Sequence, residues 1–290
     1  MKKIILASLA ALSLVAPLQA QAQEAKLLGI KGLSANVGAV SDYRFRGISQ
    51  SFDKAAVQGG IDYAHSSGFY VGNWNSSINE GAGYPSAHWE NDYYAGFKKS
   101  LGNFGLDVGV IYYDYPGSNA VDDPTQSGRN IYNPTTGNKK YGSVSNKEFY
   151  LGGSWKWLSA KWFYSVADYF SMPDTKGTQY LDLGSNVELS DGWAWNAHIG
   201  VLKTKGINSS TLDVDYMDYK LGVTKEVRGF VLGASAIWTS ANAGTCNSSN
   251  FGSKSGPFCY TDNLGYTVNN AKNVINAGRS TVVFSVTKGF

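Results

Sequence analysis

The sequence predicts an all-β protein: a transmembrane, antiparallel up-and-down β-barrel of about twelve strands. Three observations lead to this fold class. Apolar and polar residues alternate with a period of two along many segments, as in strands that have one apolar and one polar face. Short turns and long polar loops connect these segments alternately. Beyond the N-terminal region, no segment approaches the roughly 18 consecutive apolar residues of a membrane-spanning helix, so any span must be a strand of a closed barrel.

The N-terminus has the features of a cleavable export signal. Two lysines precede an apolar run over 4–15, and residues 20–22 (AQA) fit the small-residue site of a signal peptidase. We therefore expect residues 1–22 to be a signal peptide and residues 23–290 to form a single barrel domain. The expected location is the outer membrane of a Gram-negative bacterium.

Twelve segments combine the period-two pattern with a length near the roughly 9 to 11 residues that cross a bilayer at a tilt. We expect strands at 33–46, 56–65, 69–75, 88–100, 104–115, 146–157, 160–169, 179–189, 193–202, 216–226, 230–240 and 279–290. In the fourth strand Trp89, Tyr93 and Phe97 share one face, while Glu90 and Asp92 share the other. We assign the apolar face to lipid and the polar face to the lumen.

The connections between these strands are of two kinds that alternate. Tight turns are expected at 66–68, 101–103, 157–159, 190–192 and 228–229. Longer polar loops are expected at 47–55, 76–87, 116–145, 170–178, 203–215 and 241–278. This sorting suits a barrel with both termini and all turns in the periplasm and the loops outside. The two longest loops are long enough to fold over or into the lumen.

The last strand ends on an aromatic residue. Val282, Phe284 and Val286 share a face with the terminal Phe290. A final phenylalanine resembles the signal read by the barrel-insertion machinery, so we expect Phe290 to be the membrane-insertion signal and that machinery to be a partner. Lys288 interrupts the apolar series, and we expect its ammonium group to reach the lipid headgroups near the rim.

Charge and cysteine content exclude other classes. Loss of residues 1–22 takes two lysines and no acid from the 25 basic and 22 acidic residues, so the mature net charge is near +1. That balance argues against nucleic-acid binding. Cys246 and Cys259 lie in one polar segment of an exported chain, which favours a disulfide over a metal or redox site. We expect no cofactor.

The chain resembles the TorF-type porin family, proteobacterial outer-membrane proteins that are largely uncharacterised. The resemblance rests on residues 34–50 (SANVGAVSDYRFRGISQ), 58–63 (QGGIDY), 68–72 (GFYVG) and the terminal strand, and it covers most of the mature chain. It implies an outer-membrane barrel with a pore and no established substrate.

The first strand carries the main candidates for function. If the alternation continues through it, Tyr43 and Phe45 face lipid while Asp42, Arg44 and Arg46 face the lumen near its outer mouth. Two neighbouring guanidinium groups would bias a pore toward anions, whereas pairing with wall acids would make them structural. The pore-lining residues that we expect are Asp42, Arg44, Arg46, Asp62, Glu90, Asp92 and Lys98.

These features favour a channel for passive diffusion of small hydrophilic solutes or ions, embedded in outer-membrane lipid and lipopolysaccharide. A structural or adhesive barrel that does not conduct, with loops that recognise a surface partner, is the alternative. An outer-membrane hydrolase is favoured less. Its basis is that His88, Glu90 and Asp92 alternate onto one face at the start of a strand. The sequence leaves open the natural solute, the gating and the oligomeric state.

Overall fold

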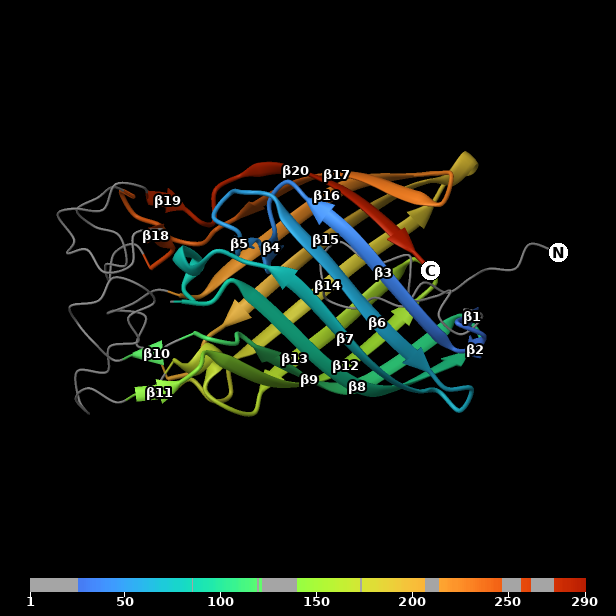
Figure 1. Ribbon diagram of the computed structural model, residues 1–290, viewed down its shortest axis with the longest axis horizontal. Coiled ribbons are helices and arrows are strands. Elements are labelled where there is room, and N and C mark those ends of the chain that lie inside the picture. Colours follow the sequence, from blue (N-terminus) through green and yellow to red (C-terminus); the bar gives the residue numbers. More distant parts are fainter. Residues whose placement is uncertain are drawn as a thin grey trace.

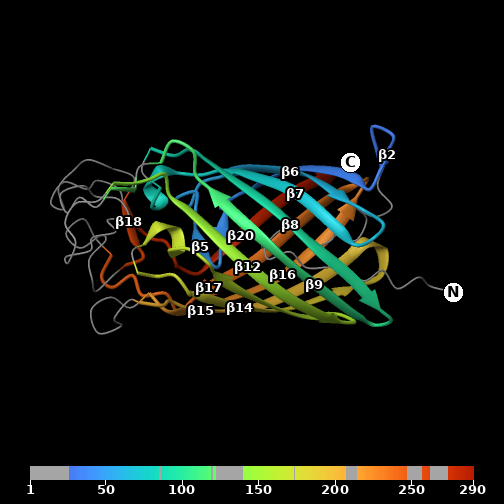
Figure 2. The same ribbon diagram turned by 90° about the horizontal axis from the view of Figure 1, so that it is seen from below.

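Twelve antiparallel strands close into a single barrel in the computed structural model, seen from two sides in Figures 1 and 2, which confirms the expected fold class. The structure describes residues 26–84, 86–118, 120–121, 140–172, 174–206, 214–246, 257–261 and 274–290. The expected signal peptide and much of the long loops lie outside these ranges. The barrel strands are β3 (Leu33–Val40), β6 (Ala56–Ala64), β7 (Phe69–Ser77), β8 (Trp89–Leu101), β9 (Phe104–Asp114), β12 (Ser145–Trp155), β13 (Leu158–Ser165), β14 (Gln179–Glu188), β15 (Trp193–Lys203), β16 (Tyr216–Val227), β17 (Phe230–Thr239) and β20 (Thr281–Gly289).

Short elements occupy the two ends of the barrel. They are the paired strands β1 (Lys26–Leu27) and β2 (Ile30–Lys31), β4 (Arg44–Phe45) and β5 (Ile48–Ser49), β10 (Ala120–Val121) and β11 (Lys140–Gly142), and β18 (Cys259–Thr261) and β19 (Val274–Asn276). Three single-turn 3-10 helices also occur: η1 (Glu80–Ala82), η2 (Tyr169–Ser171) and η3 (Ser190–Gly192). In the part of the chain that the structure describes, no helix is long and apolar enough to cross a membrane.

Each barrel strand pairs with the strands before and after it in sequence, and the final strand closes the ring on the first. In that closing pair Val286 of β20 lies opposite Ala39 of β3. The backbone N–H of Phe290 continues the ladder by donating to the carbonyl of Ala35 at 2.9 Å. Closure satisfies the backbone groups that an open sheet edge would leave unpaired.

The two ends of the barrel differ in their connections. The tight turns lie at the end that also holds β1, β2 and the C-terminus, which we call the turn end (Figure 1). The opposite end, which carries η1, η2, β10, β11, β18 and β19, is called the loop end (Figure 1). The expected alternation of short and long connections is therefore confirmed.

The outer surface of the barrel is apolar. Every barrel strand presents a large exposed apolar side chain, in most cases about half accessible. One from each strand is Val37, Ile61, Val71, Tyr93, Val110, Leu151, Leu158, Leu183, Ile199, Leu221, Leu232 and Phe284. The alternate positions are polar and face inward, where Glu90 and Asp92 have no exposed surface. This arrangement reverses that of a soluble protein and is typical of a barrel surrounded by lipid.

The first strand is shorter than the sequence predicts. It ends at Val40 instead of continuing to residue 46. The assignment of Tyr43 and Phe45 to the lipid face is wrong, because both are buried inside the barrel, with 3% and 6% of their surface exposed. The chain leaves the wall after Ser41, whose backbone N–H still bonds to the carbonyl of Phe284.

Candidate pore constriction and lumen

The segment 41–55, here called the insert, leaves β3 and folds into the barrel at the loop end, so that β4 and β5 lie within the barrel outline in both views (Figures 1 and 2). Its hairpin turns through Arg46 and Gly47, which have φ values of 48° and 79°, as in a type I′ turn. A β-carbon at Gly47 would overlap the side chains of Asp218 on β16 and Thr239 on β17. Glycine thus permits both the turn and the close approach.

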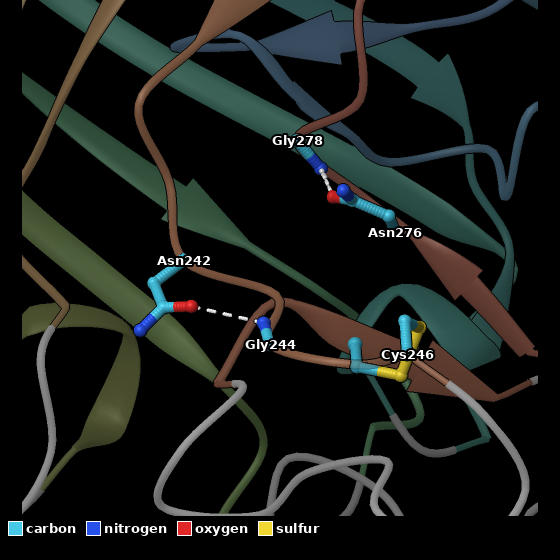
Figure 3. The surroundings of a disulfide bond; sticks show 6 residues. Asn242, Gly244, Cys246, Asn276 and Gly278 are labelled. Atoms are coloured by element: carbon cyan, nitrogen blue, oxygen red, sulfur yellow. Dashed lines mark hydrogen bonds between the residues drawn. A yellow bond between two sulfur atoms is a disulfide. The ribbon is translucent and has the colours of Figure 1, made fainter.

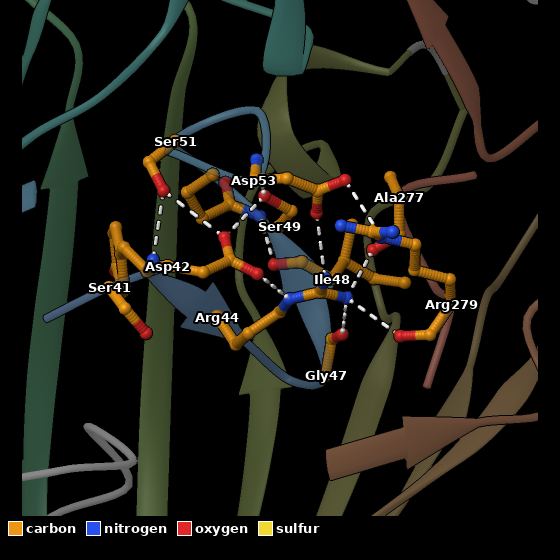
Figure 4. Close-up of polar contacts among 12 residues, drawn as sticks. Ser41, Asp42, Arg44, Gly47, Ile48, Ser49, Ser51, Asp53, Ala277 and Arg279 are labelled. Atoms are coloured by element: carbon orange, nitrogen blue, oxygen red, sulfur yellow. Dashed lines mark hydrogen bonds and ion pairs between the residues drawn. The ribbon is translucent and has the colours of Figure 1, made fainter. Parts of the chain in front are cut away.

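A compact ion cluster fixes the base of the insert (Figure 4). Arg44, only 1% exposed, pairs with Asp42 and donates from Nη2 to Asp53 Oδ1 at 2.8 Å. Arg279, before β20, reaches the other oxygen of Asp53 at 2.8 Å. Nη1 of Arg44 donates to the carbonyl of Ala277 at 2.8 Å, and two serine hydroxyls of the insert donate to Asp42. Two arginines and two aspartates therefore neutralise one another.

The tip of the insert is tied to the opposite wall by Arg46. Its Nη1 and Nη2 donate to Glu148 Oε1 and Oε2 at 3.1 and 2.7 Å, a bidentate pair in which both residues are buried. Tyr113 and Ser165 also donate hydroxyl hydrogen bonds to Glu148. Burial lowers the pKa of Arg46, but the charge of Glu148 more than offsets this and raises the pKa well above its ordinary value. The guanidinium therefore stays charged.

Aromatic rings enclose the same guanidinium. Its central carbon lies between 4.2 and 5.7 Å from the ring centroids of Phe45, Phe163, Tyr169 and Tyr180. Such cation–π contacts are stronger where water is excluded. The pair with Glu148 is thus part of a packed core inside the barrel.

The insert touches widely separated parts of the wall. Glu148 lies on β12, five strand positions from β3 in the barrel order. Tyr43 packs edge-on against Trp74 of β7, and Phe45 packs edge-on against Tyr113 of β9, each with ring centroids 5.4 Å apart. With Gly47 at the tip close to β16 and β17, the insert contacts several separate parts of the wall at the loop end.

Two acidic residues lie beneath the insert without a basic partner. Glu90 and Asp92 are fully buried, and neither forms an ion pair with a base among the described residues. Tyr115 donates to Glu90 Oε1 at 2.7 Å. Burial raises the pKa of the Tyr43 phenol, and the charges of Glu90 and Asp92 raise it further.

Further along the lumen, acids and lysines alternate around the wall. Asp107 Oδ2 lies 2.7 Å from Lys161 Nζ and 3.9 Å from Lys98 Nζ. Asp62 accepts a hydrogen bond of 2.5 Å from the hydroxyl of Tyr94. The wall here is polar and charged, in contrast to the packed aromatic core at the insert.

Tyrosine rings in this region lie flat against glycines of the neighbouring strand. Tyr94 is the register partner of Gly72, and Tyr150 is the register partner of Gly109. A β-carbon at either glycine would overlap the tyrosine above it. The glycines thus keep these bulky side chains close to the wall instead of across the lumen.

A histidine sits between two aspartates on the other side of the lumen. His198 Nδ1 lies 3.2 Å from Asp182 and Nε2 lies 2.7 Å from Asp218, with the Tyr180 hydroxyl 3.1 Å from Nε2. Periodicity places His198 of β15 in the lumen but does not identify its partners, because they come from the two neighbouring strands, β14 and β16.

The expected pore residues divide into two groups. Asp62, Glu90, Asp92 and Lys98 lie on barrel strands and face inward, as the sequence predicts. Asp42, Arg44 and Arg46 do not line the wall of the first strand, because they belong to the insert. The structure brings Asp42 and Arg44 together but carries Arg46 to Glu148, which lies on a distant strand. That these seven residues line a pore remains a prediction.

Sequence reasoning missed the insert although a local signal was present. Arg46 and Gly47 lie between Phe45 and Ile48, which is the pattern of a two-residue hairpin with β-forming residues on each side. The period-two alternation of the hairpin continues that of β3, so periodicity alone merges the two.

The arrangement expected for a hydrolase does not form. His88 is exposed at the loop end before β8, while Glu90 and Asp92 are fully buried inside the barrel. The histidine and the acids therefore lie in different environments. Within the described residues, no group of three or more His, Cys, Asp or Glu side chains is arranged to hold a metal ion.

The expected disulfide is confirmed: Cys246 is bonded to Cys259, the first residue of β18 (Figure 3). Near it, the Asn242 side chain accepts from the N–H of Gly244 at 2.9 Å. Phe258, next to the bridge, packs edge-on against Tyr216 with ring centroids 5.1 Å apart. The bridge therefore joins two loop-end segments that also contact the barrel.

Comparisons with known proteins give a family but no activity. The model of a family described as "Bacterial protein of unknown function (Gcw_chp)" matches residues 24–290. No curated protein matches the sequence.

Among solved structures, the chain is similar to several porins at low sequence identity. The KdgM porin is 8% identical with a TM-score of 0.45, over 89% of this chain and 98% of that chain. The NanC porin is 7% identical with a TM-score of 0.47, over 88% and 97%. OprD of Pseudomonas aeruginosa is 8% identical with a TM-score of 0.35, over 90% and 67%.

Proposed function

This chain belongs to the Gcw_chp family of bacterial proteins of unknown function, and we infer its activity from its geometry. We propose that it is an outer-membrane channel for passive diffusion of small hydrophilic solutes or ions, narrowed at the loop end by the insert. It needs no cofactor, and its surroundings are outer-membrane lipid and lipopolysaccharide. Phe290, exposed on the outer face beside β3, is its insertion signal, and the barrel-insertion machinery is its partner during assembly.

The observation that carries this proposal is the polarity of the lumen. Acidic or lysine side chains face inward on seven of the twelve strands, β6, β8, β9, β12, β13, β14 and β16, while the outer face is apolar. A barrel of twelve strands is wider than the eight-stranded kind that wall side chains fill. This distribution best supports passive diffusion of small hydrophilic solutes or ions along a hydrated path beside the polar wall.

The insert supplies the narrow part of the path. It contacts widely separated parts of the wall, and its position depends on Arg46 and Glu148. Because the Arg44 cluster is internally neutral and Arg46 is paired, the two arginines add little net positive charge at the mouth. We therefore expect Arg44 and Arg46 to bias the pore toward anions less than their sequence positions predict.

The charge of the wall favours cations. Register places nine acids on inward-facing strand positions: Asp62, Glu90, Asp92, Asp107, Glu148, Asp182, Glu188, Asp218 and Glu226. The basic groups that face inward on barrel strands are fewer: Lys98, Lys161, Lys220 and His198, which lies between Asp182 and Asp218. Since rings of acidic side chains attract cations into a pore, we expect a preference for small cations or cationic solutes.

A barrel that does not conduct and binds a surface partner through its loops is the second candidate. The dense packing of the insert at the loop end favours it, because a permanently seated insert would block the lumen. The hydrolase hypothesis lacks support, since His88 and the buried acids do not converge.

Single-channel recording decides between the two candidates. The mature chain is refolded, tested for a heat-modifiable band on a gel and inserted into a planar bilayer, with a reversal potential measured in a salt gradient. We expect reproducible conductance steps and a reversal potential whose sign indicates selectivity for cations. A folded barrel that remains electrically silent would overturn the channel proposal in favour of the surface-binding one.

A further inference from the structure

The outward-facing charges at the two ends of the barrel differ. On the described barrel strands, the outward positions nearest the turns carry Lys99, Lys225 and Lys288 and no acidic residue. Near the loop end the outward positions include Asp114 and two lysines, so the two signs are mixed. The surface at the level of the turns is therefore positively charged where it meets the membrane.

Two of these lysines are held against exposed aromatic rings. Lys225 Nζ lies 5.1 Å from the ring centroid of Trp193, and Lys288 Nζ lies 5.1 Å from that of Phe230. Trp193 and Phe230 are 45% and 46% exposed on the outer face. Aromatic rings at this position favour the headgroup level of a bilayer, so the ammonium groups they hold lie at the depth of lipid phosphates.

The pair of Lys225 with Trp193 and the pair of Lys288 with Phe230 lie on either side of the turn at 228–229 and form a single surface. Strand β17, which begins at Phe230, lies between the strands that carry Lys225 and Lys288. A β-carbon at Gly229 would lie 2.5 Å from Lys288 Nζ, so this ammonium rests on the turn that also contains the exposed Arg228. We call Trp193, Lys225, Arg228, Phe230 and Lys288 the basic rim patch.

Acidic groups near the basic rim patch are few. The backbone carbonyl of Asp191, in the adjacent turn, accepts a hydrogen bond from Lys225. The carboxylate of Asp191 is the one acidic side chain in that turn. Glu226 follows Lys225 but faces the lumen by register. The C-terminal carboxylate lies on the far side of Lys288, beside β3. Three basic side chains therefore share one exposed surface with a single acidic side chain at its edge.

We propose that the basic rim patch binds the headgroup of an anionic phospholipid in the membrane leaflet next to the turn end. The lysine and arginine groups pair with the lipid phosphate, while the rings of Trp193 and Phe230 pack against the glycerol and upper acyl chain. Attraction to an anionic surface is worth on the order of fivefold in affinity for each basic residue that takes part. This proposal rests on the membrane location but not on conduction through the lumen.

Native mass spectrometry with a defined lipid mixture tests the proposal. The refolded wild-type barrel is mixed with equal amounts of phosphatidylglycerol and phosphatidylcholine, and the ratio of the two lipids that stay bound is measured. We expect at least about fivefold enrichment of phosphatidylglycerol. The Lys225→Gln/Arg228→Gln/Lys288→Gln variant should bring the ratio close to one.

A matched variant controls for loss of charge as such. Lys147→Gln/Lys203→Gln removes two outward-facing lysines at the loop end, and it should keep the wild-type ratio. An unchanged ratio in the triple variant, or an equal loss in the loop-end variant, would overturn the proposal. If the triple variant fails to give a heat-modifiable band, Lys288→Gln alone is used, with about a fivefold loss expected.

Free anion has to be distinguished from lipid. Inorganic phosphate is added to the wild-type complex at constant ionic strength, and the bound phosphatidylglycerol should be retained. Displacement by inorganic phosphate would mean that the surface recognises a free anion, and would overturn the assignment to lipid. Conductance of the same preparation is recorded separately, so failure of the channel proposal leaves this outcome unaffected.

Discussion

The pair of Arg46 and Glu148 holds the tip of the insert, and replacing Arg46 by Met should release it. Methionine keeps an unbranched apolar side chain but removes the bidentate pair and the cation–π contacts with four rings. Glu148 would remain buried, retaining hydroxyl donors from Tyr113 and Ser165.

The expected cost follows from these contacts. Removing one partner of a buried ion pair typically destabilises by about 3 to 5 kcal/mol. Because the two hydroxyl hydrogen bonds still satisfy part of Glu148, we expect the low end, about 3 kcal/mol. That free energy shifts the equilibrium between seated and released insert by roughly a hundredfold.

The assay is single-channel recording of wild type, Arg46→Met and the double variant Arg46→Met/Glu148→Leu. The single variant should raise conductance or open probability strongly. The double variant should restore a seated insert in large part, because an apolar pair of similar volume can replace a buried ion pair at little cost. Lys161→Met is the matched control, since it breaks the buried pair with Asp107 within the wall and away from the insert.

Equal open probability and conductance in wild type and Arg46→Met would refute the reasoning that this pair holds a constriction. An increase of the same size in Lys161→Met would refute it as well, because the effect would then reflect general loosening of the barrel.

Three other predictions concern the lumen and the insert. Glu90→Gln/Asp92→Asn removes two acids that have no basic partner among the described residues, so the reversal potential in a salt gradient should move away from the value for a purely cation-selective pore. An unchanged reversal potential would exclude these two acids from the ion path through the lumen. Arg44→Gln/Arg46→Gln should move selectivity toward cations, since Asp42 and Glu148 lose the arginines that neutralise them, and an unchanged reversal potential would remove both arginines from the mechanism. Gly47→Ala places a β-carbon against the side chains of Asp218 and Thr239 at a positive φ, and for such a strained substitution we expect about 1 to 3 kcal/mol of destabilisation. The barrel should then lose its compact gel band at a lower temperature than wild type, and an unaltered temperature would contradict the close approach.

Much of the barrel follows from short-range pattern. Trp89, Tyr93 and Phe97 face outward and Glu90 and Asp92 face inward, as their alternation predicts, because successive side chains of a strand point to opposite faces. A closed barrel in lipid has an apolar outside and a polar inside. Once one residue of a strand is assigned to a face, the alternation therefore gives the face of every other residue in that strand. The disulfide follows equally from two cysteines in one exported segment.

The insert is where that reasoning fails. Residues 41–46 alternate as a strand would, yet their apolar side chains pack on rings that line the lumen and not on lipid. A hairpin folded inward and a strand in the wall have the same period. The choice between them depends on contacts with residues distant in sequence, such as the pair of Arg46 with Glu148.

The sequence by itself determined the number of strands, the direction that most wall residues face and the sorting of turns from loops. These properties depend on local periodicity and on chain length relative to bilayer thickness. Only the tertiary structure decided which charges neutralise one another. Ion pairs such as Arg46 with Glu148 and His198 with Asp218 form between strands that closure brings together, and closure is a property of the whole chain.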